Sequence, residues 1–323
     1  MKIVILLSLL FTAPAMALTF SSADQQSVLA VHGKFKYQLG ALGYQWQEPG
    51  KAQAVGGTDQ FSLSLAGAHR LNDTVTLIGE MGWDILSDSV RGDQLYADQA
   101  WLGVRINEVL DVTVGRSDSP FTQITDITDV FNIFGGHGYM YQDITLDDQL
   151  KIGYYENNID IRMAYAVNDN NKQDDNRDTK AQYAISAGYT ANNGIGVVLA
   201  YENKLEADVN SDIRSMAAGI NYTSPYGIYF GVTRGQTRYQ QAWNIRQLNY
   251  WESVLSYSMK KLALGIGYNR LSVGEPWHEK WVSEYIVAGE YYLMPQAKIY
   301  AEWLLNDMDG TDNLYGVGMQ YYF

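Results

Sequence analysis

The sequence contains no cysteine, so it has neither disulfide bonds nor thiolate side chains that could bind a metal or act as a nucleophile. Basic residues are comparatively few, with 23 Lys and Arg against 36 Asp and Glu, which gives a net charge of −13. Because nucleic acid is itself an anion, this balance argues against a DNA or RNA partner. The 4 histidines do not have the spacing of a zinc motif. We therefore expect neither a metal nor another cofactor.

Long apolar stretches are also scarce, and the one present follows Met1-Lys2 at the start of the chain. The run Ile3–Phe11 precedes small residues that end in Ala15-Met16-Ala17, a pattern typical of a secretory signal peptide. This run is too short to cross about 30 Å of hydrocarbon as a helix. We expect cleavage after Ala17, so that residues 1–17 are the signal peptide and residues 18–323 form one domain without a transmembrane helix.

Polar and apolar residues alternate with a period of two through the rest of the chain. The alternation is clearest at the C-terminus, where Tyr315, Val317, Met319, Tyr321 and Phe323 fall on one face. A period of two predicts a β-strand. In a soluble protein such a terminal strand would leave an edge prone to aggregation, whereas a closed membrane barrel pairs its last strand with its first. The 25 Tyr and 8 Trp also suit the aromatic belts of a membrane barrel.

Sixteen segments show this alternation, an even number as bacterial membrane barrels require. They are residues 29–44, 61–71, 75–85, 96–106, 110–116, 150–155, 159–167, 181–189, 195–202, 213–222, 228–237, 247–257, 262–270, 282–293, 297–305 and 312–323. Short connections rich in Asn, Gly and Pro alternate with longer polar ones, so tight turns lie at one end and long loops at the other. The mean hydropathy of −0.23 fits, because half of each strand is polar. We predict an all-β fold, a 16-stranded antiparallel transmembrane β-barrel.

Charged residues within the predicted strands fall mainly on one face. Glu80 and Arg162 are examples, each alternating with apolar residues on the opposite face. If the charged face lines a water-filled interior, the exterior remains apolar. The opposite assignment would place these side chains in hydrocarbon, at a cost of about 2–4 kcal/mol for an arginine at the bilayer midplane.

One connection, residues 117–147, is too long and too apolar to lie free in solvent. Its apolar residues recur at spacings of three and four, which predicts a short helix. We expect this connection to fold into the barrel and to pack against the wall. The pair Gly135-Gly136 would then allow the sharp turn by which the chain leaves.

Several short motifs occur in a defined order along the chain. They are Gly33-Lys34 on the first predicted strand, Gly115-Arg116 before the long connection, Asp129 and Phe134-Gly135-Gly136 within it, and Ala297–Asp309 and Tyr315–Phe323 at the end. In this order and spacing they resemble the trimeric general diffusion porins of Gram-negative outer membranes. The likeness covers the whole mature sequence.

The resemblance implies a homotrimer whose third loop, here the 117–147 connection, narrows the pore at mid-height. In that family, acidic groups on the loop face basic groups on the wall, and the field between them sorts solutes by charge. Together with the strand pattern, the resemblance gives two sets of candidate residues. The constriction set is Lys34, Glu80, Asp98, Arg116, Asp129, Lys151 and Arg162, and the set that shapes the loop is Phe134, Gly135 and Gly136.

The sequence also departs from the family pattern. Ile133 stands where a second loop carboxylate is common, and Ser62 and Asp98 lie near positions that are usually arginine. The row of basic residues is therefore thinner than in the family, and the field across the pore should be weaker or differently directed. With a net charge of −13, we expect a preference for cations.

The resemblance further implies partners and a location in the cell outer membrane. The barrel would contact outer-membrane lipid and lipopolysaccharide, and its cargo would be small hydrophilic solutes. The outer-membrane assembly machinery would recognise the terminal Phe323. We expect no enzymatic activity, since neither Ser87 nor Ser119 has a convincing catalytic partner. The acidic stretch Asp307–Asp312 resembles the start of a calcium loop but lacks the later glutamate.

Two alternative functions remain open from the sequence. In the first, aromatic side chains near the loops stack on sugar rings and make the channel selective for saccharides; the residues concerned are Trp46, Trp243, Trp277 and Trp281. In the second, the loops form a surface for adhesion or for phage attachment, with the long polar loop Asn168–Lys180 as the main contact.

Overall fold

The computed structural model describes residues 18–45, 48–88, 94–139, 145–167, 179–206, 211–241, 244–274 and 279–323. The predicted signal peptide, residues 1–17, lies outside this set. Within the described ranges, no helix is both long enough and apolar enough to cross a bilayer.

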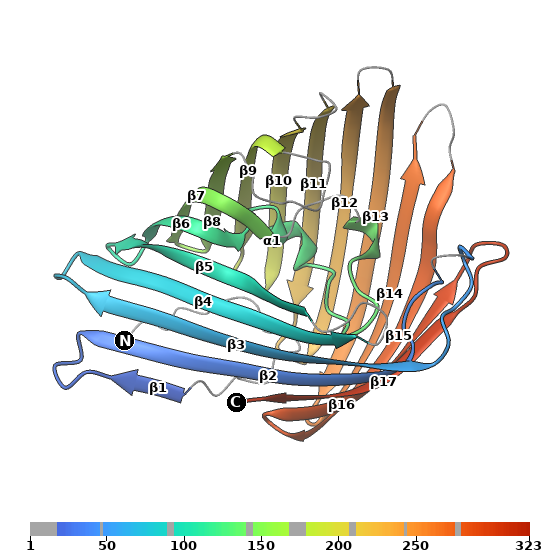
Figure 1. Cartoon of the computed structure of the whole chain (residues 1–323), viewed down its shortest axis with the longest axis horizontal. Helices are drawn as coiled ribbons and strands as arrows, with labels where there is room; N and C mark the ends of the chain where they lie inside the picture. The colour runs from blue at the N-terminus through green and yellow to red at the C-terminus, as the bar shows by residue number, and fades with distance from the viewer. Residues whose placement is uncertain are drawn as a thin grey trace.

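The fold is a closed barrel of sixteen antiparallel strands, β2 to β17, in which sequence neighbours pair and β17 pairs with β2 (Figure 1). The strands are β2 Ser27–Ala41, β3 Gly56–Arg70, β4 Val75–Asp88, β5 Gln94–Ile106, β6 Leu110–Asp118, β7 Thr145–Glu156, β8 Ile159–Val167, β9 Thr179–Thr190, β10 Ile195–Glu206, β11 Ser211–Thr223, β12 Ile228–Gln241, β13 Asn244–Met259, β14 Leu262–Val273, β15 Lys280–Met294, β16 Ala297–Asn306 and β17 Leu314–Tyr322. The predicted 16-stranded antiparallel β-barrel is therefore confirmed, and each expected segment overlaps one strand.

The structure has an additional short strand, β1 (Leu18–Ser21), that the sequence did not predict. It pairs with β2 through Leu18 opposite Val31, while β17 pairs with the same edge of β2 through Tyr322 opposite Lys34. Strands β1 and β17 therefore follow one another along a single edge of β2. A strand of 4 residues is too short for its alternation to be distinguished from chance.

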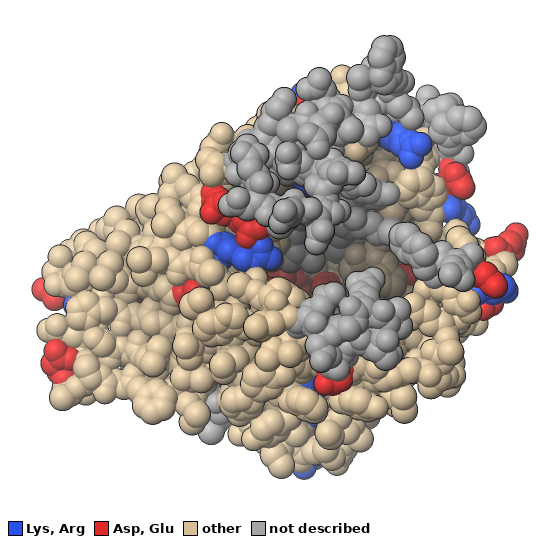
Figure 2. All heavy atoms as spheres, in the orientation of Figure 1, with Lys and Arg blue, Asp and Glu red and all other residues tan. Residues whose placement is uncertain are grey.

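The barrel wall has an apolar outer face and a polar inner face. Along β16, Ile299 and Trp303 are 43% and 59% exposed, whereas Tyr300 and Glu302 between them are 4% and 2% exposed. In Figure 2 the visible outer surface is mostly uncharged, and charged side chains gather at its margins and around the opening. This arrangement places apolar side chains toward lipid and polar ones toward the interior.

Tight turns connect the strands at one end of the barrel. In the turn between β5 and β6, Asn107 and Glu108 have φ angles of 52° and 60°, and between β7 and β8 Asn157 and Asn158 have 50° and 69°. Two successive residues with positive φ form the hairpin turn whose twist matches that of the flanking strands. The longer connections lie at the opposite end, which is the extracellular end in outer-membrane barrels. We call these the turn end and the loop end.

Candidate functional site

The candidate site is built around the connection between β6 and β7, whose described part, residues 119–139, we call the β6–β7 segment. It contains the short helices α1 (Thr122–Thr125) and η1 (His137–Tyr139). Phe121 and Ile124 are 1% and 0% exposed and pack with Leu248, Tyr250 and Leu271, whose side chains lie opposite the exposed apolar face. In Figure 1, α1 lies within the ring of strands.

A second apolar cluster holds the other end of the segment. Phe134 is 1% exposed and packs with Ile286, Leu304 and Leu314 of β15, β16 and β17, and Phe131 and Ile133 lie against the same group. The segment is therefore attached at two places to the wall from β10 to β17. The wall from β3 to β8, which contributes to neither cluster, is left facing it.

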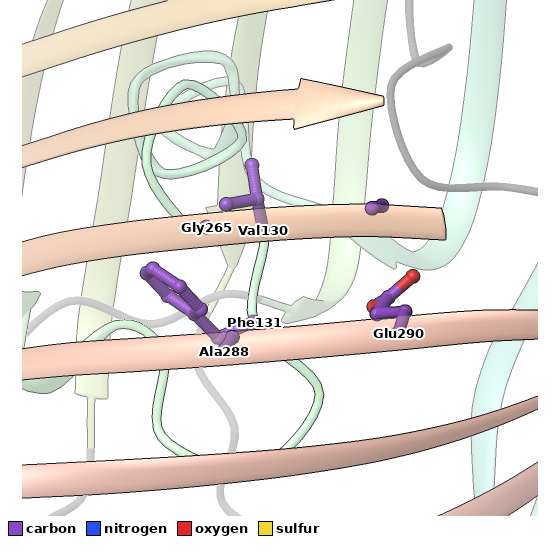
Figure 3. Close-up of a pocket in the computed structure, with 6 residues that line it drawn as sticks. Val130, Phe131, Gly265, Ala288 and Glu290 are labelled. Carbon is purple, nitrogen blue, oxygen red and sulfur yellow. The ribbon is translucent and has the colours of Figure 1, made fainter. Parts of the chain in front are cut away.

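Glycines in the wall make room for the segment. An added Cβ at Gly231 would lie 2.4 Å from the carbonyl oxygen of Ile127, and one at Gly267 would lie 2.5 Å from the ring of Phe131. Figure 3 shows Val130 and Phe131 beside Gly265 of β14 and other residues that line a small pocket under the segment. At Gly231 any side chain would push the backbone of the segment away from the wall.

Replacing Gly231 by alanine should therefore displace the segment. We expect a destabilisation of about 1–3 kcal/mol, as for overpacked cores, and a changed single-channel conductance. Gly265→Ala is the matched control, because its Cβ would lie 3.4 Å from Phe131, an ordinary contact. Equal behaviour of the two variants in planar-bilayer recordings and thermal unfolding would show that close packing at Gly231 is unimportant.

Carboxylates of the wall bind the backbone of the segment. Glu302, which is 2% exposed, accepts hydrogen bonds from the backbone N–H groups of Asn132, Ile133 and Phe134 at 2.5, 2.9 and 3.1 Å. The Asn132 amide donates to both Glu302, at 3.0 Å, and Glu290, at 2.5 Å. Glu302 thus satisfies three donors that the irregular backbone would otherwise leave unpaired.

Three further glutamates hold the remainder of the segment. Glu252 accepts from Thr128 Oγ1 at 2.8 Å and from the backbone N–H of Gly138 at 2.6 Å. Glu284 lies 2.6 Å from Nδ1 of His137. The third, Glu202, accepts from Ser119 Oγ at 3.1 Å. None of these glutamates was among the predicted site residues, although all of them are buried side chains of the wall strands.

The basic residue of β2 that contacts the segment is Lys36 rather than the predicted Lys34. Its Nζ donates to the carbonyl oxygen of Asn132 at 2.9 Å, and Gln38 Nε2 donates to the same oxygen at 3.0 Å. Lys34 is two residues away on the same face of the strand. Both lysines therefore project to the interior, and Lys36 is the one within reach of the segment.

The predicted basic residues of the facing wall are bound to local partners. Arg116 forms an ion pair with Asp147, and Arg162 forms one with Asp160, with 2.7 Å between NH2 and Oδ2. Lys151 donates to the carbonyl oxygen of Asp118 at 3.0 Å.

The predicted acidic residues of the same wall are half-buried. Glu80 accepts from Ser64 Oγ at 2.6 Å. Asp98 lies at an irregularity between β4 and β5, where the register shifts between Gly82 and Trp83. No ion pair in the described residues joins this wall directly to Asp129.

Asp126 and Asp129 present their carboxylates from the segment to the interior. Both are solvent-exposed, yet surrounding protein raises the pKa of Asp126 to about 6 and also raises the pKa of Asp129, where His137 and Lys36 oppose the effect. Asp129 Oδ1 lies 2.0 Å from where a Cβ of Gly135 would stand. Gly135 is thus required for this approach, and Gly136, with φ 68°, supplies the turn.

His137 and the acidic loop between β16 and β17 have structural contacts. Burial lowers the pKa of His137, but its hydrogen bond to Glu284 and the charge of Glu284 leave that pKa raised. Asp312 pairs with Lys51 at 3.3 Å, and Asp307 with Lys280 at 3.7 Å. In the described part of the chain, no three His, Asp or Glu side chains are grouped as a metal site would require.

Known structures share this architecture. OmpF of Salmonella typhi in complex with daunomycin has a TM-score of 0.80 at 16% identity, covering 94% of this chain and 100% of that one. OmpT of Vibrio cholerae, an outer-membrane protein, has a TM-score of 0.75 at 16% identity, with 95% and 100% covered. An anion-selective porin from Comamonas acidovorans has a TM-score of 0.72 at 13% identity, with 92% and 100% covered.

Sequence comparison gives the family. No curated protein matches the chain. The profile of the family described as Gram-negative porin, however, matches residues 12–322, nearly the entire sequence. With its closed barrel of sixteen strands, the chain belongs to the Gram-negative porins and is an integral protein of the outer membrane.

Proposed function

We propose that this porin forms a water-filled channel for passive diffusion of small hydrophilic solutes and ions, that the β6–β7 segment narrows the channel, and that the channel prefers cations. The observation that carries the proposal is the attachment of the segment along the inner side of β10 to β17, opposite the wall of β3 to β8. A solute crossing the barrel would pass between the segment and that wall.

The charges around this passage support a preference for cations. Arg105, Arg116 and Arg162 are each paired with a carboxylate, at Asp111, Asp147 and Asp160 respectively. Their positive charge is therefore largely balanced within the wall. Asp126 and Asp129 are exposed on the segment and lack an ion pair within 4.0 Å among the described residues. In a confined pore, such unbalanced carboxylates raise the local concentration of cations.

In a KCl gradient across a planar bilayer, the reversal potential should show K⁺ permeating more readily than Cl⁻. Because the pKa of Asp126 is raised to about 6, this carboxyl is charged above that pH and neutral below it. The preference for cations should therefore decline as the pH falls through about 6. Asp126→Asn should lower the preference at neutral pH and remove this part of the pH dependence.

Asp73→Asn is the control for this measurement, because it removes one carboxylate from the turn between β3 and β4. It should leave the reversal potential unchanged. A reversal potential that indicates anion preference in the unmodified porin would refute the proposed selectivity.

The proposed constriction consists of the segment and the wall that it faces. Glu80, Asp98, Arg116, Lys151 and Arg162 would line that wall, with Lys34 on the adjoining strand β2. Asp129, Phe134, Gly135 and Gly136 would set the shape and charge of the segment. We add Lys36, which the structure joins to the segment. We also propose a homotrimer surrounded by outer-membrane lipid and lipopolysaccharide; one related structure, OmpT of Vibrio cholerae, is described in a trimer form.

The alternative functions gain no specific support. Trp281 packs against the apolar cluster that holds Phe121 and Ile124, which is a structural role. Trp46, Trp243 and Trp277 lie outside the described residues, as does most of the Asn168–Lys180 loop.

A further inference from the structure

A buried lysine lies among the glutamates that hold the β6–β7 segment. Lys298 of β16 is 3% exposed, and its Nζ lies 3.1 Å from Oε1 of Glu290 on β15, which is 4% exposed. Glu290 in turn lies beside Val130 and Phe131 of the segment (Figure 3). Lysines are seldom fully buried, because the ammonium group loses its water. Lys298 therefore acts on the groups packed around it rather than on passing ions.

Glu290 and Glu302 lie side by side under the segment. The side-chain nitrogen of Asn132 donates to an oxygen of each, at 2.5 and 3.0 Å. Glu302 also accepts the backbone N–H groups of residues 132–134. Two buried carboxylates this close repel each other, which favours protonation of one of them unless a cation is near. A protonated carboxyl presents an O–H donor where the segment needs an acceptor.

Lys298 is the cation that balances this pair of glutamates. Among the described residues, it is the basic side chain that lies within 4.0 Å of a carboxylate oxygen of the pair. Lys36 approaches from β2, but its Nζ donates to the carbonyl oxygen of Asn132. The rings of Tyr292 and Tyr300 flank the Lys298 ammonium group, with centroids 5.9 and 5.8 Å from Nζ. Their π faces compensate part of the lost hydration.

Glu290 links the lysine directly to the segment. Its Oε1 accepts from both Lys298 and the side-chain nitrogen of Asn132, and its Oε2 accepts from the hydroxyl group of Tyr292 at 3.2 Å. One carboxylate oxygen is thus shared between the buried cation and the segment. Loss of the cation would change the charge on the group that binds Asn132.

We propose that Lys298 is a positioning residue of the channel. Its ammonium group keeps Glu290 and Glu302 ionised together, so that both remain acceptors for the β6–β7 segment. The lysine thereby fixes the position of the segment from behind, without lining the passage. The inference rests on the proposed function in one respect, since the segment must narrow the channel for its position to affect conduction.

The position of the segment can be measured separately from conduction, because the chain contains no cysteine. Ile133→Cys introduces one thiol where the segment packs against the cluster around Phe134. Its rate of reaction with a water-soluble maleimide reports release of the segment. In this background K298M should react about tenfold or more faster, since removing one partner of a buried ion pair leaves the other charge unbalanced. A second series with Val130→Cys guards against an effect of the reporter itself.

Further variants separate charge balance from packing. K298R keeps the positive charge and should react at a rate closer to that of the I133C porin than to that of K298M. K298M/E290Q removes both charges of the ion pair and should recover most of the slow reaction, because a buried pair can be replaced by neutral side chains at little cost. K280M is the matched control; Lys280 of β15 pairs with Asp307 at 3.7 Å, and their side chains are 48% and 54% exposed. It should leave the rate unchanged.

Two results would overturn the inference. An unchanged rate in K298M would show that the lysine does not hold the segment. An equal increase in K298M and K298M/E290Q would show that its packing, not its charge, is what matters. If K298M does not assemble, assembly of K298M/E290Q would support the charge pair, and failure of both would count against it.

Single-channel conductance of the same variants tests the proposed channel function independently. K298M should conduct more than the unmodified porin, and K298M/E290Q should return toward the original value. A fast thiol reaction with unaltered conductance would leave the role of Lys298 intact and refute the constriction. A slow reaction in K298M would reject the role of Lys298 and leave the constriction untouched.

Discussion

Replacement of Glu302 by glutamine should release the middle of the β6–β7 segment from the wall and raise the single-channel conductance. The carboxylate accepts three backbone N–H groups of residues 132–134 and an amide N–H of Asn132. Hydrogen bonds to a charged group contribute about 1.5–3 kcal/mol each. Glutamine retains one acceptor oxygen but presents an NH₂ group to donors that need an acceptor. The local cost is therefore several kcal/mol, enough to populate arrangements in which the segment has left its position.

Planar-bilayer recordings would report this release directly. We expect Glu302→Gln to give a larger mean conductance with more frequent transitions, and to admit larger neutral sugars in liposome swelling. Glu156→Gln is the control, because Glu156 lies at the turn end of β7 and accepts only from the neighbouring Tyr154 in the described structure. A variant of Glu302 with unaltered conductance and unaltered sugar exclusion would show that the glutamate does not position a constriction.

The barrel itself was predictable because each level of the sequence indicates the same architecture. Strand residues alternate with a period of two, and the connections alternate between tight turns and longer loops. In the β7–β8 turn, for example, Asn157 and Asn158 are among the residue types that tolerate positive φ. Closure of the barrel was predictable as well, because the first and the last predicted strands both have an apolar outer face. In the structure these two strands pair, and Tyr322 lies opposite Lys34.

The contacts of the segment could not be predicted in the same way. Lys34 and Lys36 lie on the same face of β2, and alternation alone does not distinguish them. The position of the segment along the barrel axis decides which of the two reaches Asn132. The glutamates that bind the segment come from five distant positions on four strands. Their common signal was a carboxylate at an inward position of the wall. Its partner, however, is the backbone of an irregular segment, and no periodic pattern encodes that pairing.

Arginine positions illustrate the same limit. The family resemblance implied basic residues facing the loop across the pore. In the structure, Arg116 pairs with Asp147 on the neighbouring strand, and Arg162 pairs with Asp160 on its own strand. Pairing of this kind depends on which side chains share a face at close range.

Deletion of Phe323 should impair assembly of the barrel far more than conduction. Phe323 completes the seam between the last strand and β2, because its N–H donates to the Gly33 carbonyl at 3.0 Å and its carbonyl accepts from the Gly33 N–H at 2.8 Å. Its ring lies over Gly33, with Cζ 2.0 Å from where a Cβ would stand, and stacks with Phe61 at 6.2 Å and Tyr321 at 6.3 Å. A side chain at position 33 would occupy the place of the ring.

The deletion removes two hydrogen bonds of about 1 kcal/mol each and two aromatic contacts of about 0.5–1.5 kcal/mol each. We propose in addition that the assembly machinery recognises this terminal aromatic residue. Together these losses should reduce the amount of folded porin in outer membranes about tenfold or more, measured as the heat-modifiable form on gels. Channels that do form should conduct normally, since the described contacts of Phe323 are with residues of the seam and its outer face.

Phe323→Tyr, which keeps the ring, should assemble like the unmodified porin. Tyr321→Ala removes an outward aromatic from the same strand and separates ring stacking from recognition of the terminus. Normal assembly of the truncated chain would show that the seam closes without its last residue.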